Sequence, residues 1–272
     1  MPAGAYYSVC SIIALLFLAP LGWLLVSSFK GSAEFAAVPP TYLPHHPGLD
    51  NYRGLDAAGV LRNVANSAVV SVATVALATG LCVLAGYGFA RFTFRGRGTL
   101  FLIVLSTLMI PFQSIIPSLY TILDAAHLTN SLVGLVLVYT TFALPFGVFT
   151  MRASFSAIPL SLEEAALIDG ASELTLLWRV MVPMVVPGIA TVALYSFFNA
   201  WNEFLAALIF TTRPEKFTLP VVLSNLQTGA AGTLNWGVLE TGAIVSAVPC
   251  IAVFLILQRY YVSGLTNGAV KG

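Results

Sequence analysis

Apolar runs with few or no charges, separated by shorter polar segments, make up most of this chain. Each run is at or near the length of about 20 helical residues that crosses the hydrocarbon core of a bilayer. The pattern predicts an all-α integral membrane fold, with residues 1–272 forming a single transmembrane domain. The six expected transmembrane helices cover residues 8–29, 64–90, 98–123, 128–151, 183–212 and 241–261.

The first run could also be read as a secretory signal peptide. Residues 8–29 are longer than the apolar core of a signal peptide, about 7–15 residues, and no convincing small-residue cleavage site follows them. We therefore expect this run to be retained as a membrane span.

A polar segment between the fourth and fifth runs carries a dense group of charges. Ser161 followed by Glu164 forms a capping-box pattern, which predicts a helix that starts just after Ser161. Gly170 can adopt the left-handed conformation that ends a short helix, and Ser172 can cap a second helix. The segment at 160–183 is therefore predicted to be a helix–glycine–helix elbow.

Apolar residues recur at helical spacing in both halves of this elbow. We expect them to form the packed faces of the two helices and the polar residues to meet water or a partner. The apolar positions are Leu162, Ala165, Ala166, Leu174, Leu177 and Met181.

Charge in the short loops predicts how the chain is oriented. Arg91, Arg95 and Arg97 lie between the second and third runs with no acidic residue among them, and basic loops of this kind stay in the cytoplasm. Alternation then places both termini and the elbow at 160–183 on the cytoplasmic side. Three arginines form too short a cluster for a nucleic-acid-binding surface.

Two long polar segments are expected on the outer side. Residues 30–63 contain many turn-forming residues and predict an extended loop, while residues 213–240 predict a second loop or linker. His45 and His46 could be metal ligands, but two adjacent histidines alone make a poor site, so no metal site is predicted.

The third run contains two helix-breaking residues. Pro111 and Pro117 each remove a helix hydrogen bond and permit a kink, which a membrane tolerates beside protein or a water-filled cavity. Gln113 is therefore a candidate for lining a transport pathway. The alternative is that it makes a hydrogen bond between helices.

The fifth run contains an intramembrane carboxylate. Asn199, Asn202 and Glu203 stand at positions i, i+3 and i+4, so one helical face is polar. A carboxylate inside a membrane is costly and indicates a function by default. These three residues are predicted to line a pathway, and the alternative is that Glu203 lies near the outer interface and is solvated.

The elbow resembles a known motif. Glu164-Ala165-Ala166, three residues, Gly170, nine residues and Val180-x-Val182-Pro183 match the cytoplasmic EAA loop of ABC importer permeases, although Ile and Leu are usual where this chain has its two valines. The chain is also similar to the maltose-type, carbohydrate-uptake branch of that family. That similarity is carried by Gly86-Tyr87-Gly88-Phe89-Ala90-Arg91, by Ala200-Trp201-Asn202-Glu203-Phe204 and by residues 264–272.

The resemblance implies a permease subunit of an ATP-driven, binding-protein-dependent importer in a prokaryotic inner membrane. A sugar or sugar-like solute would move inward by alternating access. The elbow would dock into a cleft of an ATPase subunit, and the C-terminal tail would enter the interface between two ATPase subunits. The expected coupling residues are Glu163, Glu164, Ala165, Ala166, Asp169, Gly170 and Pro183.

The resemblance also implies partners for this chain. They are a second permease subunit, two ATPase subunits that hold ATP and Mg, an extracellular solute-binding protein and membrane lipid. The long outer segment at 213–240 would correspond to the permease loop that reaches into the sugar site of the binding protein.

Composition supports a membrane transporter and argues against several other classes. Only 8% of residues are charged and the mean hydropathy is +0.90, whereas about a quarter charged is typical of soluble domains. The net charge of +1 gives no electrostatic reason to bind nucleic acid. No Walker A pattern occurs, so we expect no cofactor on this chain, no enzyme activity, and ATP hydrolysis on separate subunits.

Two other functions were weighed against an ABC permease. An ion-coupled secondary transporter could use Glu203 as its coupling site, but such proteins usually show internal repeats and paired broken spans, which this sequence does not convincingly contain. An intramembrane enzyme would need a nucleophile–base pair or metal cluster at membrane depth, and no histidine lies in any predicted span.

Overall fold

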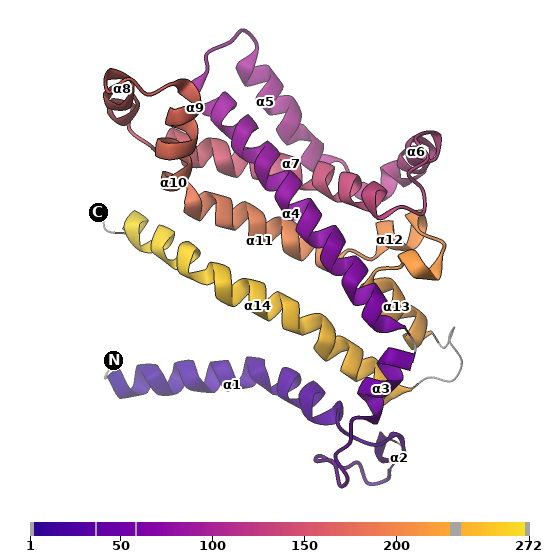
Figure 1. Cartoon of the computed structure of the whole chain (residues 1–272). Helices are drawn as coiled ribbons and strands as arrows, with labels where there is room; N and C mark the ends of the chain where they lie inside the picture. Colours follow the sequence, from indigo (N-terminus) through magenta and orange to yellow (C-terminus); the bar gives the residue numbers. More distant parts are fainter. Residues whose placement is uncertain (1–2, 36, 58, 229–234, 270–272) are drawn as a thin grey trace. The chain divides into compact units, whose positions relative to one another are not determined.

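Helices joined by loops form the described part of the computed structural model, which covers residues 3–35, 37–57, 59–228 and 235–269 (Figure 1). No strand occurs within these ranges. Four of their helices are long and apolar enough to cross a membrane alone, and the number rises to six when each of two bent helix pairs is taken as one span. The chain divides into two compact units, residues 1–65 with 218–251 and residues 66–217 with 252–272.

The four long helices correspond to the first, second, fourth and sixth predicted runs. Their ends differ from the predicted ones by a few residues in either direction, because hydropathy marks the apolar stretch and not the ends of the helix. In α14 the helix extends through eight more residues than predicted, into the polar tail. The helices are α1 (Ala3–Ser27), α4 (Val60–Arg91), α7 (Leu132–Ser156) and α14 (Trp236–Ala269).

The third predicted run is broken into two helices bent by 104°. The break falls at Ile110, whose backbone is extended (φ −82°, ψ 114°), because the residue before a proline is driven out of the helical conformation. Pro117 lies inside the following helix without interrupting it, so only Pro111 produces a break. The elements are α5 (Arg97–Ser106), η1 (Thr107–Met109) and α6 (Phe112–Ala125).

The fifth predicted run is also broken. A helix over Glu173–Met184 meets α11 (Val186–Asn202) at an angle of 76°, with the break at Val185. The run was predicted to begin at Pro183, but this proline lies near the end of the helix Glu173–Met184, directly after its π-helical turn. A second break at Glu203 separates α11 from α12 (Leu205–Phe210).

The two segments predicted to be outer loops, 30–63 and 213–240, contain short helices. α3 buries only two of its residues, so a hydropathy pattern built for membrane spans does not reveal it. Within 213–240, Gly229 and Gly232 lie outside the described residues. The short helices are α2 (Ser32–Phe35), α3 (Asp50–Ala57), η3 (Pro214–Lys216) and α13 (Leu219–Gln227).

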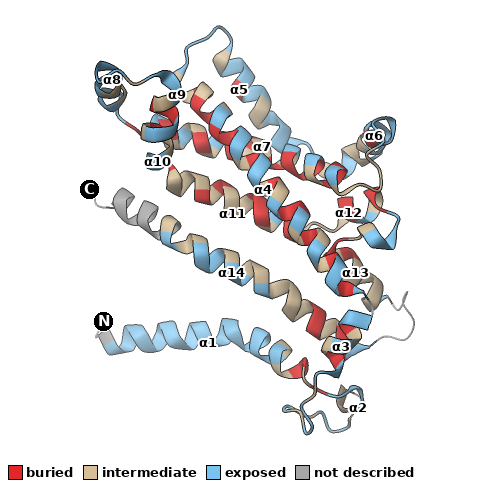
Figure 2. Cartoon of the chain, viewed as in Figure 1, coloured by how far each residue is buried: buried red, intermediate tan, exposed pale blue. Residues whose placement is uncertain are grey.

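Buried polar contacts join three elements of the first unit. The Asn51 side chain donates to the carbonyl oxygens of Ser28 (2.9 Å) and Lys30 (2.8 Å). Thr241 Oγ1 donates to the Ser28 carbonyl as well (3.4 Å). The end of α1, the start of α3 and the start of α14 are therefore fixed by hydrogen bonds. Most of α1 is otherwise exposed (Figure 2), as expected of a helix that faces lipid.

Close packing of α4, α7 and α11 forms the core of the second unit. A Cβ on Gly86 of α4 would collide with Met151 of α7, and one on Gly147 of α7 would collide with Cys82 of α4. Small residues at these points let the helix backbones approach one another, as is usual between membrane helices. Within this unit, α8 (Leu160–Ile168) and α6 lie at opposite ends of α7 (Figure 1).

Candidate functional site

The elbow at one end of α7 has the predicted glycine turn. Gly170 is left-handed (φ 81°), and no atom beyond its chain neighbours lies within 4 Å of a Cβ built on it. The Ser172 hydroxyl accepts from the Thr175 N–H (3.3 Å), which confirms the predicted cap of the second helix. The first helix of the elbow, α8, therefore ends where the sequence predicted.

The start of α8 was predicted incorrectly. The helix begins at Leu160 behind Pro159, whose extended backbone (φ −60°, ψ 139°) serves as the N-cap without a side-chain hydrogen bond. Ser161 therefore lies inside the first turn and cannot form the capping box with Glu164. A proline before the first helical residue sets the start because its own N–H is absent and its φ already suits a helix entrance.

The predicted packed face of α8 is confirmed at Ala166 but wrong at Leu162 and Ala165. Glu163 and Ala166 are its half-buried residues, and the others are exposed, including Leu162 and Ala165. Ile168 is 86% exposed. An apolar surface at the elbow is therefore left open, and an acidic residue points toward the chain's own core.

Glu163 forms a buried ion pair with Arg91 at the C-terminal end of α4. The two side chains are 14% and 8% exposed. Arg91 also donates through Nη2 to the carbonyl oxygen of Ile158 (2.7 Å), in the turn that precedes α8. The arginine-rich loop and the elbow, which the sequence predicted to face the same compartment, therefore lie at the same end of this unit.

A π-helical turn sets the inward face of the second elbow helix. Leu176, Leu177 and Met181 are buried, whereas Leu174 is 70% exposed. The predicted face of Leu174, Leu177 and Met181 assumed regular α-helical spacing, and the wider turn of a π-helix replaces Leu174 with Leu176. The elements are α9 (Glu173–Thr175), η2 (Leu176–Met181) and α10 (Val182–Met184).

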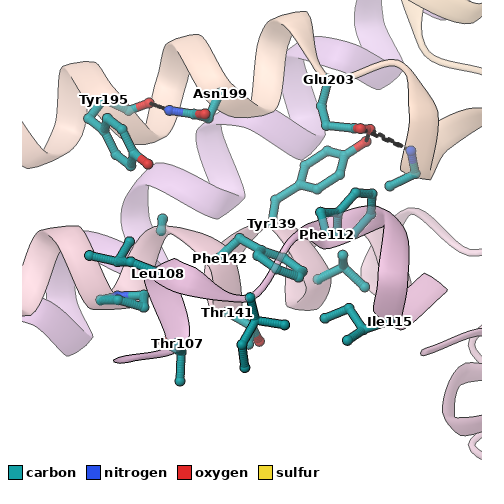
Figure 3. A pocket seen from close by; sticks show the side chains of 15 residues that line it. Thr107, Leu108, Phe112, Ile115, Tyr139, Thr141, Phe142, Tyr195, Asn199 and Glu203 are labelled. Atoms are coloured by element: carbon teal, nitrogen blue, oxygen red, sulfur yellow. Dashed lines mark hydrogen bonds between the residues drawn. The ribbon is translucent and has the colours of Figure 1, made fainter. Parts of the chain in front are cut away.

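A cavity of about 490 Å³ lies toward the other end of α7 (Figure 3). Two of the three helix breaks reach it, since Ile110 and Glu203 are among its lining residues. Irregular backbone at membrane depth is tolerated where it borders a cavity or protein. Its walls are largely aromatic and aliphatic, with a few polar groups. The polar or aromatic lining residues are Thr107, Phe112, Tyr139, Thr141, Phe142, Tyr195, Asn199 and Glu203.

The Glu203 carboxylate is held by three hydrogen-bond donors. It accepts from the backbone N–H groups of Ala206 (2.9 and 3.0 Å) and Ala207 (3.1 Å), at the start of α12. The hydroxyl of Tyr139 on α7 donates to it at 2.9 Å. Glu203 therefore caps a helix and ties α7 to α12, a role that neither sequence interpretation included.

The other pathway candidates lie in different surroundings. Asn199 lines the cavity, and its side chain donates to the Tyr195 carbonyl of its own helix (2.8 Å). Asn202 is exposed and faces an adjoining pocket with Asn199 and Glu203. Gln113 is exposed on α6 and is not among the cavity-lining residues, although its neighbour Phe112 is.

Sequence reasoning missed the aromatic side chains of the cavity. Tyr139, Phe142 and Tyr195 lie inside apolar runs, where aromatic residues are ordinary constituents of a membrane helix. A tyrosine in the middle of the fourth run was the one available signal. Its partner, Glu203, is 64 positions away, so only the fold shows that the two meet.

The two adjacent histidines make a local contact through their backbone. The backbone N–H groups of His45 and His46 donate to the Glu34 carboxylate (3.1 and 3.5 Å). Desolvation acts to raise the pKa of Glu34, but these donors and the charges of His45 and Lys30 lower it below its usual value. Across the described residues, no three His, Cys, Asp or Glu side chains come together as metal ligands.

Comparisons with known proteins agree on one family. The family described as binding-protein-dependent transport system inner membrane component matches residues 60–267. The sulfoquinovosyl glycerol permease SmoH of Agrobacterium fabrum is 35% identical over 267 residues, 98% of this chain and 93% of that protein. The trehalose permease SugB of Mycobacterium tuberculosis is 36% identical over 256 residues, 94% of this chain and 93% of that protein.

Solved structures agree on the fold. A subunit of a bacterial ABC transporter involved in the import of the acidic polysaccharide alginate superimposes with a TM-score of 0.80, at 23% identity, over 95% of this chain and 96% of that one. A chain of the MetNI methionine ABC transporter gives a TM-score of 0.57 at 17% identity, over 78% of this chain and 97% of that one. The match over residues 60–267 and relatives at 35% and 36% identity show that the chain belongs to the family of inner-membrane components of binding-protein-dependent transport systems, the permeases of ABC importers.

Proposed function

We propose that this chain is one permease subunit of an ATP-driven importer that moves a sugar or sugar-like solute inward by alternating access. The observation that carries the proposal is the family match over residues 60–267, together with relatives at 35% and 36% identity whose names specify a sulfosugar glycoside and trehalose. The cavity is compatible with such a solute. Aromatic walls can pack against the apolar faces of a sugar ring, and a few polar groups can orient its hydroxyls.

The importer requires subunits that this chain does not supply. We propose a second permease subunit, two ATPase subunits that bind ATP and Mg, and an extracellular solute-binding protein. A structural relative is titled as a bacterial alginate ABC transporter in complex with a pentasaccharide-bound periplasmic protein, which supports the last of these. ATP hydrolysis would take place on the ATPase subunits, and the permease would convert their closure into movement of its spans.

We further propose six spans with both termini in the cytoplasm, counting each bent pair as one span. The contact of Arg91 with Glu163 supports this topology, because it joins two segments assigned to the cytoplasm. At the other end of α7, Asn130 Oδ1 accepts from the Arg213 N–H (3.0 Å), which joins two segments assigned to the outer side.

Impermeant thiol labelling of intact cells tests this topology. Arg95→Cys and Ser172→Cys should stay unlabelled while Ser32→Cys reacts. All three positions are exposed in the structure, so this chain does not itself shield them from the reagent. Permeabilised cells provide the control, in which all three should react. Labelling of position 95 from outside would overturn the orientation.

We propose the elbow at 160–183 as the ATPase-coupling segment and the cavity as part of the transport pathway. The exposed apolar residues of α8, beside Glu164 and Asp169, offer a surface that a partner can cover. Pro183 lies at the base of the elbow, where the bend into α11 begins. The pathway candidates are Asn199, Asn202 and Glu203. Gln113 is a candidate by prediction alone, because it does not line the cavity.

Uptake measurements with the purified complex test the function itself. The complex isolated through this chain should contain an ATPase and, in proteoliposomes with its binding protein, import at least one of trehalose, maltose and diacetylchitobiose only when ATP is supplied. Replacing ATP with a non-hydrolysable analogue is the control. The ion-coupled alternative is not favoured by the family, and uptake driven by a pH gradient without ATP would revive it and contradict the importer.

A further inference from the structure

Arg91 and Glu163 meet where α4 ends and α8 begins its first turn. The contacting atoms, Arg91 Nε and Glu163 Oε1, are shielded from solvent, and neither has another hydrogen-bond partner among the described residues. A buried charge that loses its partner is strongly unfavourable, because neither water nor another group replaces the lost interaction. Separating the two side chains therefore costs a large free energy, and the pair moves as a unit.

The apolar side chains of α8 contribute little burial that would hold this helix in place. No residue of this helix is buried, and Ala166 is its other half-buried side chain, at the edge of the core cluster. The second elbow helix differs, because Leu176, Leu177 and Met181 anchor it in the core. The hydrogen bond from Arg91 to Ile158 extends the polar attachment to the turn before α8. Besides its packing against η2, α8 is therefore tied to α4 by the polar contacts of Arg91.

The end of α4 that carries Arg91 is packed tightly against α7. Next to Arg91, Tyr87 packs edge-on against Phe155 of α7 at a centroid distance of 5.4 Å. Gly86 lies against Met151 so closely that a Cβ would not fit. A displacement of α8 that is carried through Arg91 therefore moves the ends of α4 and α7 together.

We infer that the Arg91–Glu163 pair is a latch through which movement of α8 is transmitted to α4, and that Glu163 is a positioning residue that does not contact the ATPase. The inference rests on the proposed function, and it gives different roles to the two adjacent glutamates of the elbow. Glu163 holds the helix to its own chain, and the exposed Glu164 remains free for a partner.

A double-mutant cycle in the complete complex tests the latch. Arg91→Gln, Glu163→Gln and the double variant are compared with the unmodified complex, and Arg95→Gln, an exposed arginine in the same loop, is the matched control. The readouts are ATPase retained, ATP hydrolysed per molecule of trehalose, maltose or diacetylchitobiose imported, and hydrogen exchange of the amides at 160–168.

The latch predicts a loss of coupling without a loss of the partner. Both single variants should retain the ATPase, show faster exchange at 160–168, and hydrolyse on the order of tenfold more ATP per imported sugar. The double variant should be no worse than the more severe single variant, because a contact already broken cannot be broken again. Arg95→Gln should match the unmodified complex in all three readouts.

Several results would overturn the latch. Release of the ATPase by Glu163→Gln but not by Arg91→Gln would make Glu163 a partner contact. Fold-changes that multiply in the double variant would show that the two side chains act independently. Unchanged coupling in all variants of an otherwise working complex would remove the latch and leave the proposed function intact, whereas no ATP-dependent import by the unmodified complex would overturn both.

The neutral double variant keeps the test decisive if single variants fail to accumulate. Two glutamines leave no unpaired charge, so the double variant should then reach the membrane in larger amounts than either single one. A raised ratio of ATP to sugar in that variant would support the latch. A ratio equal to that of the unmodified complex would overturn it.

Discussion

Replacing Glu164 by lysine should release the ATPase from the purified permease while the chain itself stays in the membrane. Glu164 is exposed on α8, so the substitution leaves no gap in the core of this chain. If it meets a basic residue of the ATPase, reversal of its charge turns a charge-assisted contact into a repulsion that costs several kcal/mol. Glu164→Gln keeps the shape and loses only the charge, so its effect should be intermediate.

Replacing Gly170 by valine should also release the ATPase from the permease, but for a different reason. Its φ of 81° lies in the left-handed region, which costs a residue with a Cβ about 1–2 kcal/mol. Space is not the obstacle, because the surroundings of the missing Cβ are open. Gly170→Asn should therefore be mild, since asparagine tolerates this conformation better than valine.

Matched controls separate these effects from general damage. Gly96→Val meets the same backbone cost at a φ of 86°, also in open surroundings, but outside the elbow. Glu215→Lys reverses an exposed charge in η3, a segment we assign to the outer side. The measurements are ATPase copurification and sugar uptake per amount of permease in the membrane. Full ATPase retention by Glu164→Lys, or equal loss in both controls, would mean that the elbow is not the docking segment.

Replacing Glu203 by leucine should abolish sugar uptake and reduce the amount of assembled complex. The substitution removes the acceptor of the Ala206, Ala207 and Tyr139 donors. Each buried donor left without a partner costs about 1–3 kcal/mol. These donors belong to α7 and α12. Loss of their hydrogen bonds therefore removes the contacts that hold the helix break beside the cavity in place.

Glu203→Gln distinguishes a structural cap from a pathway residue. Glutamine keeps one acceptor oxygen for the start of α12, so the complex should still assemble. If the charge of Glu203 contributes to transport, sugar uptake should nevertheless fall by roughly tenfold, about 1.4 kcal/mol in the activation barrier. Tyr139→Phe is the matched variant, since it removes one donor and leaves the charge. Normal uptake by Glu203→Gln would limit this residue to the cap.

The sequence predicted those features that depend on short stretches of chain. A run of apolar residues such as 132–151 predicts a membrane helix because its transfer free energy is a sum over neighbouring side chains. The glycine turn at 170 and the cap at Ser172 were predictable because each involves groups within a few positions. The wrong start of α8 arose from two local signals in competition, and Pro159 prevailed over Ser161.

Features that depend on distant pairs were decided by the tertiary structure. Arg91 and Glu163 are separated by 72 positions, and nothing in either motif indicated that they form a buried pair. Glu203 was a recognisable intramembrane carboxylate, but only the packing of α7 against α12 revealed its donors. The hydrophobic pattern states which residues avoid water, whereas which of them meet, and which polar groups they enclose, depends on how the helices bend and pack.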